Sequence, residues 1–252
     1  MRSMRVLVFS DVHANLTALD TVLEDAARHA AAGEALDAYW YLGDLVGYGP
    51  DPNECVQRLR ALPNLVGLIG NHDQAALGQL ALSRFNREAR LAAEWTRDAL
   101  QPENRAFLQA LPSQVVLEGF TLAHGSPRQP IWEYILDYHT ADLNFDAFTT
   151  DYCLVGHSHI PLQFHRNSVD TYPEAMPVRW EEPVPLMPRM ILNPGSVGQP
   201  RDMDPRAAYA LLDTEGLTWE ACRVAYDVEA VQRRILAAGL PERHAERLAI
   251  GW

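Results

Sequence analysis

Five short apolar runs, each followed closely by a polar cluster, restrict the possible folds of this chain more than any other feature. The runs span Arg5–Phe9, Ala38–Leu42, Leu65–Ile69, Val115–Ala123 and Tyr152–Val155. Segments with apolar residues at helical spacing, such as residues 16–30, lie between strand-length runs. This alternation of strands and helices predicts an α/β fold.

The polar clusters carry the side chains of a candidate metal site. They are Asp11 and His13, Asp44, Asn71 to Asp73, His124, and His157 with His159. Any one of them is typical of a turn or of a capped helix start. Because ligands of open α/β sheets bind beyond the carboxyl ends of the strands, five such ends in succession predict a metal site at one edge.

Composition and charge exclude several other classes of protein. The 252 residues are 48% apolar and 21% charged, as in an ordinary globular protein, and no apolar run approaches the ~20 residues of a membrane span. The formal net charge of −12 disfavours binding to a nucleic-acid polymer. Three cysteines, far apart and odd in number, favour a reducing cytoplasm, and neither a signal peptide nor a membrane partner is expected.

The chain is expected to form a single domain over residues 1–252. A helical, cap-like insertion is expected at about 83–111, a proline-rich excursion from the sheet at about 166–188, and a helical tail at about 227–252. The histidines outside the polar clusters, His244 among them, are expected at the surface.

The five clusters together resemble the complete signature of the calcineurin-like metallophosphoesterases. The resemblance covers residue 5 to about 225 and is greatest to compact bacterial and archaeal predicted phosphodiesterases. The segments Asn193–Val197 and Gly198–Arg201 are also similar to that subgroup. The resemblance implies a four-layer α/β/β/α sandwich, in which two mixed β-sheets are flanked by helices.

The resemblance also implies two adjacent divalent metal ions. One ion would be held by Asp11, His13 and His159. The other would be held by Asn71, His124 and His157. Asp44 would bridge them, since its two carboxylate oxygens can face two cations. With no cysteine in these motifs, the mixed nitrogen and oxygen ligands suit Mn²⁺, and also Fe, Zn²⁺, Co²⁺ or Ni²⁺.

The expected chemistry is hydrolysis of a phosphoester by direct attack of a hydroxide that bridges the two metals, without a covalent intermediate. In the resembling family the histidine corresponding to His72 contacts the phosphate and assists departure of the leaving group. His72 is therefore assigned as a general acid or charge stabiliser.

One departure from the family pattern bears on the substrate. Protein phosphatases of the family continue from the Gly-Asp motif into Asp-Arg-Gly, whose aspartate orients the histidine and whose arginine grips the phosphate. Here Gly47 and Tyr48 stand in those places. Asp73 is a candidate partner for His72, and Tyr48 and Arg201 are candidate substrate-binding residues.

The leading interpretation is a phosphodiesterase for a small or nucleotide-like substrate. A phosphomonoesterase, including a protein phosphatase, is the alternative within the enzymes. A metal-binding scaffold for protein partners, which the sequence does not identify, is the alternative of another class. The uncoordinated His72 favours an enzyme, since a scaffold has no need of it.

Overall fold

The computed structural model describes residues 4–31 and 35–252, which form two six-stranded β-sheets and the helices around them. The first sheet contains, in spatial order, β3 (Leu65–Gly67), β2 (Ala38–Tyr41), β1 (Arg5–Phe9), β11 (Ala207–Asp213), β12 (Thr218–Val224) and β9 (Val184–Pro185). The second contains β4 (Gln114–Leu117), β5 (Phe120–Ala123), β6 (Tyr152–Leu154), β10 (Met190–Asn193), β7 (Leu162–His165) and β8 (Glu174–Met176). Both sheets mix parallel and antiparallel pairs.

The helices are α1 (Leu16–Ala31), α2 (Pro52–Arg60), α3 (Asn71–Ala76), the short 3₁₀ helix η1 (Leu82–Arg84), α4 (Arg87–Ala99), α5 (Pro102–Ala110), α6 (Tyr138–Phe145), α7 (Val228–Ala237) and α8 (Glu242–Ile250). None of the helices in the described part of the chain is long and apolar enough to cross a membrane.

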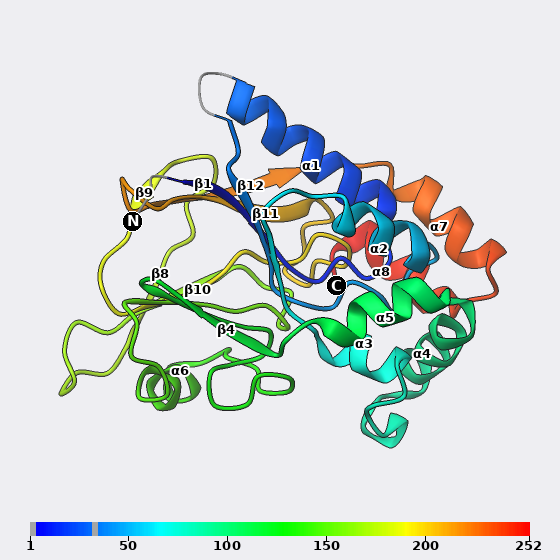
Figure 1. Ribbon diagram of the computed structural model, residues 1–252, viewed down its shortest axis with the longest axis horizontal. Coiled ribbons are helices and arrows are strands. Elements are labelled where there is room, and N and C mark those ends of the chain that lie inside the picture. Colours follow the sequence, from blue (N-terminus) through cyan, green and yellow to red (C-terminus); the bar gives the residue numbers. More distant parts are fainter. Residues whose placement is uncertain (1–3, 32–34) are drawn as a thin grey trace.

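Alternation along β1 shows how the layers are built. Val6 and Val8 point into the core between the two sheets, whereas Leu7 and Phe9 point to the core beneath α1 and α2. On the far side of the second sheet, Phe145 of α6 packs in a further apolar cluster. Figure 1 shows α1 and α6 on opposite sides of the two sheets. The expected α/β/β/α sandwich is thereby confirmed.

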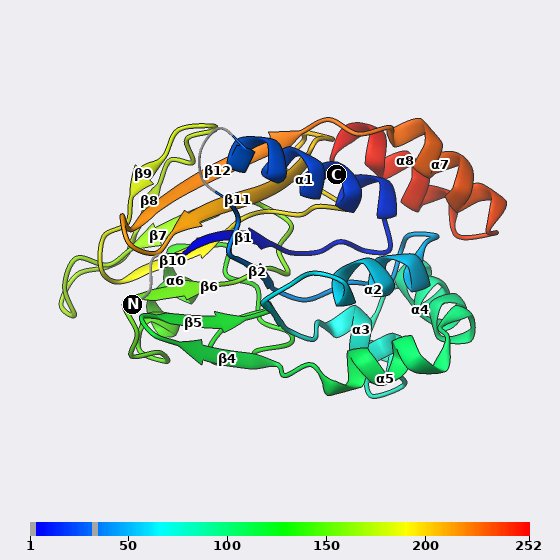
Figure 2. The same ribbon diagram turned by 45° about the horizontal axis from the view of Figure 1, so that its top comes forward.

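The parallel strands place their carboxyl ends together. β1, β2 and β3 run parallel in the first sheet, as do β5 and β6 in the second. Helices α3, α4, α5, α7 and α8 gather at one end of the sheets (Figure 2). The loops that carry the five polar clusters therefore lie between the sheets and these helices.

In two regions the observed strands differ from those that the sequence analysis predicts. The run Val115–Ala123 forms a hairpin, because Gly119 adopts a φ of +80° and turns the chain between β4 and β5. The proline-rich segment 166–188 contributes β8 and β9, one at an edge of each sheet. Pro185 lies in β9, where a proline is tolerated because the strand is at an edge.

The C-terminal segment folds into a hairpin of α7 and α8 that packs against α4 and Tyr48. Arg234 of α7 pairs with Asp51 at 2.9 Å. His244 of α8 is buried, with its Nε2 atom 3.2 Å from the backbone oxygen of Glu88. The surface position expected for His244 is therefore wrong, because the hairpin covers this histidine with α4 and Tyr48.

The burial of His244 predicts a pH-dependent loss of stability. Burial lowers its pKa to about 4, below the ordinary value of 6.5, so the unfolded chain takes up this proton first as the pH falls. Stability is then lost between pH 6.5 and 4, by about 1–3 kcal/mol from this group. Urea unfolding of the metal-free protein at several pH values should show a smaller loss in His244→Gln than in the wild type. Equal losses of unfolding free energy in the two proteins would contradict this assignment. Above pH 7 the imidazole is neutral in both the folded and the unfolded state, so the difference between the two proteins there measures only the change in packing.

Candidate metal centre

Two groups of three side chains, all buried, face each other beyond the carboxyl ends of the strands. The first group is Asp11, His13 and His159, and the second is Asp44, His124 and His157. Within each group, one possible ligand atom from each residue lies within 4.8 Å of the other two. The fold thus brings together six of the seven residues that the sequence analysis expected to hold metals.

Asp44 lies between the two groups. Its Oδ2 atom is 3.4 Å from Nε2 of His124 and 3.7 Å from Nε2 of His13. Its Oδ1 atom accepts a hydrogen bond from the backbone N–H of His72 at 2.8 Å. Oδ1 is thus held by the backbone, and Oδ2 faces a histidine of each group.

Asp11 divides its two oxygens in the same way. Oδ2 accepts the backbone N–H of His157 at 3.0 Å, whereas Oδ1 lies 3.4 Å from Nε2 of His159 and has no hydrogen-bond partner in the described chain. Oδ2 of Asp44 and Nε2 of His157 are buried and unpartnered as well. Orphaned buried polar atoms are costly, so three of them around one space fit the binding of cations.

Backbone carbonyls fix the orientation of three of the imidazoles. The Nδ1 atoms of His13, His124 and His159 lie 3.2, 2.9 and 2.6 Å from the backbone oxygens of Val46, Leu42 and Gln199. A carbonyl can only accept, so each Nδ1 donates, and in the neutral imidazole Nε2 keeps a lone pair for a metal. The Nε2 atoms of His13 and His159 accordingly converge to 3.1 Å.

Left-handed backbone conformations aim these side chains inward. Asp11, His13, Asp44, His157 and His159 all have φ between +50° and +63°. Such values are uncommon outside glycine and cost of order 1 kcal/mol or more each. Their concentration at five candidate ligands is typical of a functional site in which the turns after the strands serve ligand geometry.

Asn71, the seventh expected ligand, begins α3. Its Oδ1 atom lies 3.1 Å from Nε2 of His124, so the amide oxygen faces the second group. An amide oxygen is a suitable neutral ligand for a divalent ion.

Burial keeps three of the candidate ligand histidines neutral. It lowers the pKa of His13, His157 and His159 well below the ordinary value, which leaves their lone pairs available at neutral pH. His124 differs: burial acts to lower its pKa, but the charge and hydrogen bond of Asp44, together with the charge of Asp11, outweigh burial and raise the pKa to about 9.

The pKa values of the carboxyl groups of Asp11 and Asp44 shift in opposite directions. Burial raises the pKa of Asp11 to about 7. Burial acts in the same sense on Asp44, but the imidazoles of His124 and His72 hold the pKa of that carboxyl well below its usual range. Asp44 is therefore the anionic centre of the site.

Asp73 supports the bridging residue. Its carboxylate accepts the backbone N–H groups of Gly70 at 2.9 Å, Asp44 at 3.1 Å and Val46 at 3.0 Å. These bonds tie the loop after β2 to the turn after β3. Both oxygens of Asp73 are thus engaged with the backbone, and the carboxylate forms no hydrogen bond with His72, the partner proposed for it from the sequence.

The loop after β10 supports the first group. The hydroxyl of Ser196 donates to the backbone oxygen of Asp11 at 2.8 Å, and the N–H of Gly198 donates to the same oxygen at 2.9 Å. A Cβ at Gly198 would lie 1.7 Å from a backbone oxygen of the loop after β1, so only glycine fits there. This contact is the physical reason for the Gly198–Arg201 motif, to which the sequence analysis gave no role beyond Arg201.

His72 sits among aromatic rings. Its centroid is 4.3 Å from that of Tyr48, 5.0 Å from that of His13 and 5.1 Å from that of Phe85. Nδ1 of His72 is buried and has no hydrogen-bond partner among the described residues. Ring packing, with Gly47 against the imidazole, orients His72 here, and Phe85 is a contributor that the sequence analysis missed.

Tyr48 and Arg201 meet at the border of the site. Nη2 of Arg201 lies 3.5 Å from the hydroxyl of Tyr48 and donates to Oε1 of Gln199 at 3.0 Å. Tyr134, whose ring stacks on His157 with centroids 3.9 Å apart, was not expected from the sequence. Tyr134 lies eleven residues after the end of β5 and belongs to no motif that would have identified it from the sequence.

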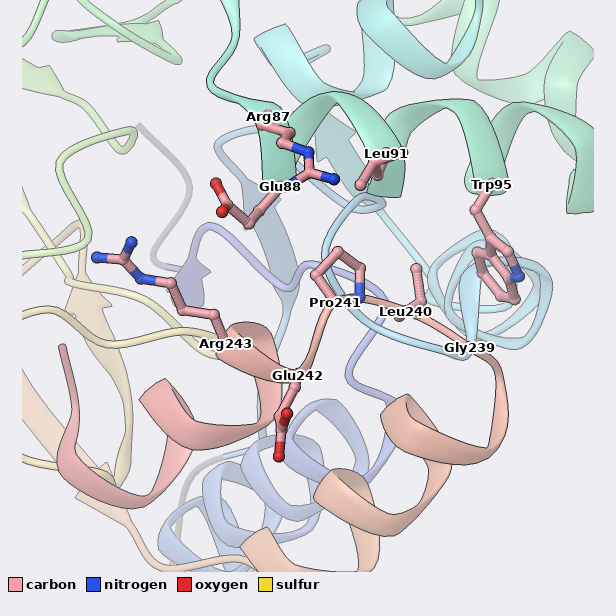
Figure 3. Close-up of a pocket in the computed structure, with 9 residues that line it drawn as sticks. All are labelled: Arg87, Glu88, Leu91, Trp95, Gly239, Leu240, Pro241, Glu242 and Arg243. Carbon is pink, nitrogen blue, oxygen red and sulfur yellow. The ribbon is translucent and has the colours of Figure 1, made fainter.

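A separate groove of about 460 Å³ lies between α4 and the start of α8 (Figure 3). Arg87, Glu88, Leu91 and Trp95 of α4 and residues 239–243 line it, and Arg243 extends away from Trp95. None of the candidate metal ligands lines this groove.

Comparison with known proteins identifies the family. The model of the calcineurin-like phosphoesterase superfamily domain matches residues 4–217, so the chain belongs to this superfamily of metal-dependent phosphoric ester hydrolases. The resemblance found in the sequence is thereby confirmed.

The relatives are bacterial and archaeal. A metallophosphoesterase from Sphaerobacter thermophilus is 45% identical, with all of both chains covered and a TM-score of 0.86. The uncharacterized protein MJ0912 of Methanocaldococcus jannaschii is 36% identical over 98% of both chains. The hypothetical protein PH1004 of Pyrococcus horikoshii shares the fold, with a TM-score of 0.82, 23% identity and 98% of both chains covered.

The hydrogen bonds of Asp73 predict that Asp73→Asn destabilises the protein and weakens metal binding. The variant replaces one acceptor oxygen with a donor that faces backbone N–H groups, at a cost of about 2–4 kcal/mol. Chemical denaturation and metal titration measure both effects. Asp213→Asn is the matched control, because Asp213 also accepts two backbone N–H groups, in the β11–β12 turn far from the site. A comparable loss in both variants would contradict the role assigned to Asp73.

Proposed function

We propose that this protein hydrolyses a phosphodiester of small or nucleotide-like size with two divalent metal ions. The observation that carries the proposal is the convergence of free ligand atoms from two triads on either side of Oδ2 of Asp44. An uncoordinated histidine, His72, lies directly beside them.

The donor set fits two cations. Asp11, His13 and His159 would hold one, Asn71, His124 and His157 the other, and Asp44 would serve both. Bound ions of this kind polarise a phosphoryl group and supply a hydroxide near neutral pH. The mixed nitrogen and oxygen donors are compatible with Mn²⁺, Fe, Zn²⁺, Co²⁺ or Ni²⁺, and Mn²⁺ is the ion we would use first.

His72 would assist the leaving group. In hydrolysis the oxygen of water bonds to phosphorus, the bond from phosphorus to the ester oxygen breaks, and that ester oxygen gains a proton. His72 belongs to neither group of candidate ligands, and its packing against the rings of Tyr48 and Phe85 limits how far it can turn. It is placed to donate a hydrogen bond to the departing oxygen, since burial lowers its pKa to about 4 and leaves the imidazole neutral at pH 7.

Arg201 and Tyr48 would bind the substrate. The positive charge of Arg201 contributes to lowering the pKa of Asp11, His13 and His72, so its guanidinium lies near the candidate metal centre. Because Gly47 and Tyr48 stand in the places of the Asp-Arg pair, this motif supplies no arginine to grip the scissile phosphate, which favours a singly charged diester over the dianion of a phosphoprotein.

The alternatives make different demands. A monoesterase would prefer the dianionic substrate, and a protein-binding scaffold would bind metal without turnover. A comparison of bis(p-nitrophenyl) phosphate with p-nitrophenyl phosphate on Mn²⁺-loaded protein separates all three. Faster turnover of the diester is the outcome expected here.

Asp44→Asn should abolish this metal-dependent turnover and lower the metal content, because an amide brings no charge to the shared position. Metal analysis after gel filtration and the diester assay measure the two effects. The exposed Asp37→Asn serves as a control for loss of one carboxylate elsewhere. Full activity with both metals retained in Asp44→Asn would overturn the bridging assignment.

His72→Ala should reduce kcat by about 10²–10³-fold with metal content unchanged. The loss should be larger for a phenyl leaving group than for p-nitrophenyl, since the poorer leaving group depends more on a proton donor. His139→Ala, which removes an exposed imidazole on α6, is the control. Loss of both metals, or the same loss of rate with both leaving groups, would make His72 structural.

A further inference from the structure

Arginine side chains from two distant parts of the chain gather beside Tyr48. Arg201 follows the loop after β10, and its backbone N–H donates to the backbone oxygen of His159 at 3.2 Å. Arg247 lies on α8, at the other end of the chain. The family model ends at residue 217, so α8 lies outside the part of the chain that it matches.

Packing of α8 places Arg247 at the site. His244, one turn earlier on the helix, has its ring centroid 4.8 Å from that of Tyr48. Leu248, on the same face, lines a small cavity with His13 and Tyr48. At the end of the helix, the backbone oxygen of Gly251 accepts the N–H of Met203 at 2.8 Å, two residues after Arg201. The helix therefore runs past both Tyr48 and the loop of Arg201.

The two guanidinium groups lack acidic partners. No aspartate or glutamate in residues 4–31 and 35–252 forms an ion pair with Arg201 or Arg247. Neighbouring arginines do have such partners: Arg223 pairs with Asp202 and Asp204. Burial and then the charge of Arg201 lower the pKa of Arg247, which indicates that the two guanidinium groups lie near each other.

Both arginines also retain donors for a ligand. Nε of Arg201 is buried and has no hydrogen-bond partner within the described chain. Arg247 donates from Nε to an oxygen of the last residue, Trp252, whose ring lies 5.6 Å from the guanidinium carbon, and its terminal nitrogens form no hydrogen bond with the described residues. Guanidinium groups with N–H donors to spare are the groups that proteins use to bind phosphate.

We propose that Arg201 and Arg247 form a second anion subsite beside the metal centre, which binds a further phosphate of the substrate. This inference rests on the proposed function and narrows its substrate class to diesters that carry another phosphate group. The metals and His72 act on the scissile phosphate, and the arginines bind the next one. The groove of Figure 3 is a weaker candidate for an anion, because two glutamates offset its two arginines.

The first test measures binding without metal or turnover. Metal-stripped protein is titrated with inorganic pyrophosphate by calorimetry, in low salt. The wild type should bind pyrophosphate, and Arg247→Gln should bind at least fivefold more weakly. Arg233→Gln, which removes an exposed arginine from the same hairpin, should bind as the wild type does. Equal affinity in the wild type and Arg247→Gln, or no binding by the wild type, would overturn the subsite.

The second test measures specificity with Mn²⁺ bound. The substrates are the 5′-p-nitrophenyl ester of thymidine monophosphate with and without a 3′-phosphate. The added phosphate should lower KM about tenfold in the wild type and have little effect in Arg247→Gln, with kcat for the simple diester unchanged. An unchanged KM preference in the variant would contradict the subsite. If the wild type turns over neither diester, the proposed function fails, and the pyrophosphate titration still decides the subsite.

Discussion

The rest of the site depends on two carboxylates that are buried where the sheets meet the loops. Asp11 and Asp44 are fully buried, and a buried charge costs several kcal/mol unless it is compensated. One oxygen of each is satisfied by a backbone N–H, and the other is left to the surrounding imidazoles and to cations. The left-handed turns, the backbone bonds of Asp73 and the loop after β10 all hold this division in place.

The sequence singled out the candidate ligands because they follow the ends of strands within a few residues. A short apolar run that ends in Asp-x-His or Gly-x-x-His contains both the strand and the candidate ligands that follow it. The local pattern was therefore sufficient to find these residues. The supporting contacts were not predictable in this way. Ser196 reaches Asp11 across 185 positions, and His244 reaches Tyr48 from α8. Such partners are chosen by packing, and no spacing in the chain encodes them.

Errors in the predicted elements have equally local causes. The run Val115–Ala123 was read as one strand because its turn contains a single glycine, Gly119, among residues that suit strands. Strands β8 and β9 are only three and two residues long, too short for any alternation to show. The helix α6 was not anticipated because only three of its eight residues are buried, and its pattern lacks a clear apolar stripe.

Gly47 and Tyr48 limit which substitutions this chain can accept beside His72. Its φ of +90° and the 2.9 Å between its would-be Cβ and Nδ1 of His72 leave no room for the aspartate found there in protein phosphatases. Tyr48, in the arginine's place, is wedged between His72 and His244. Replacing either residue alone would disturb the histidine or undermine the docking of α8. In this chain, neither Gly47→Asp nor Tyr48→Arg alone is therefore expected to reproduce the support that protein phosphatases give this histidine.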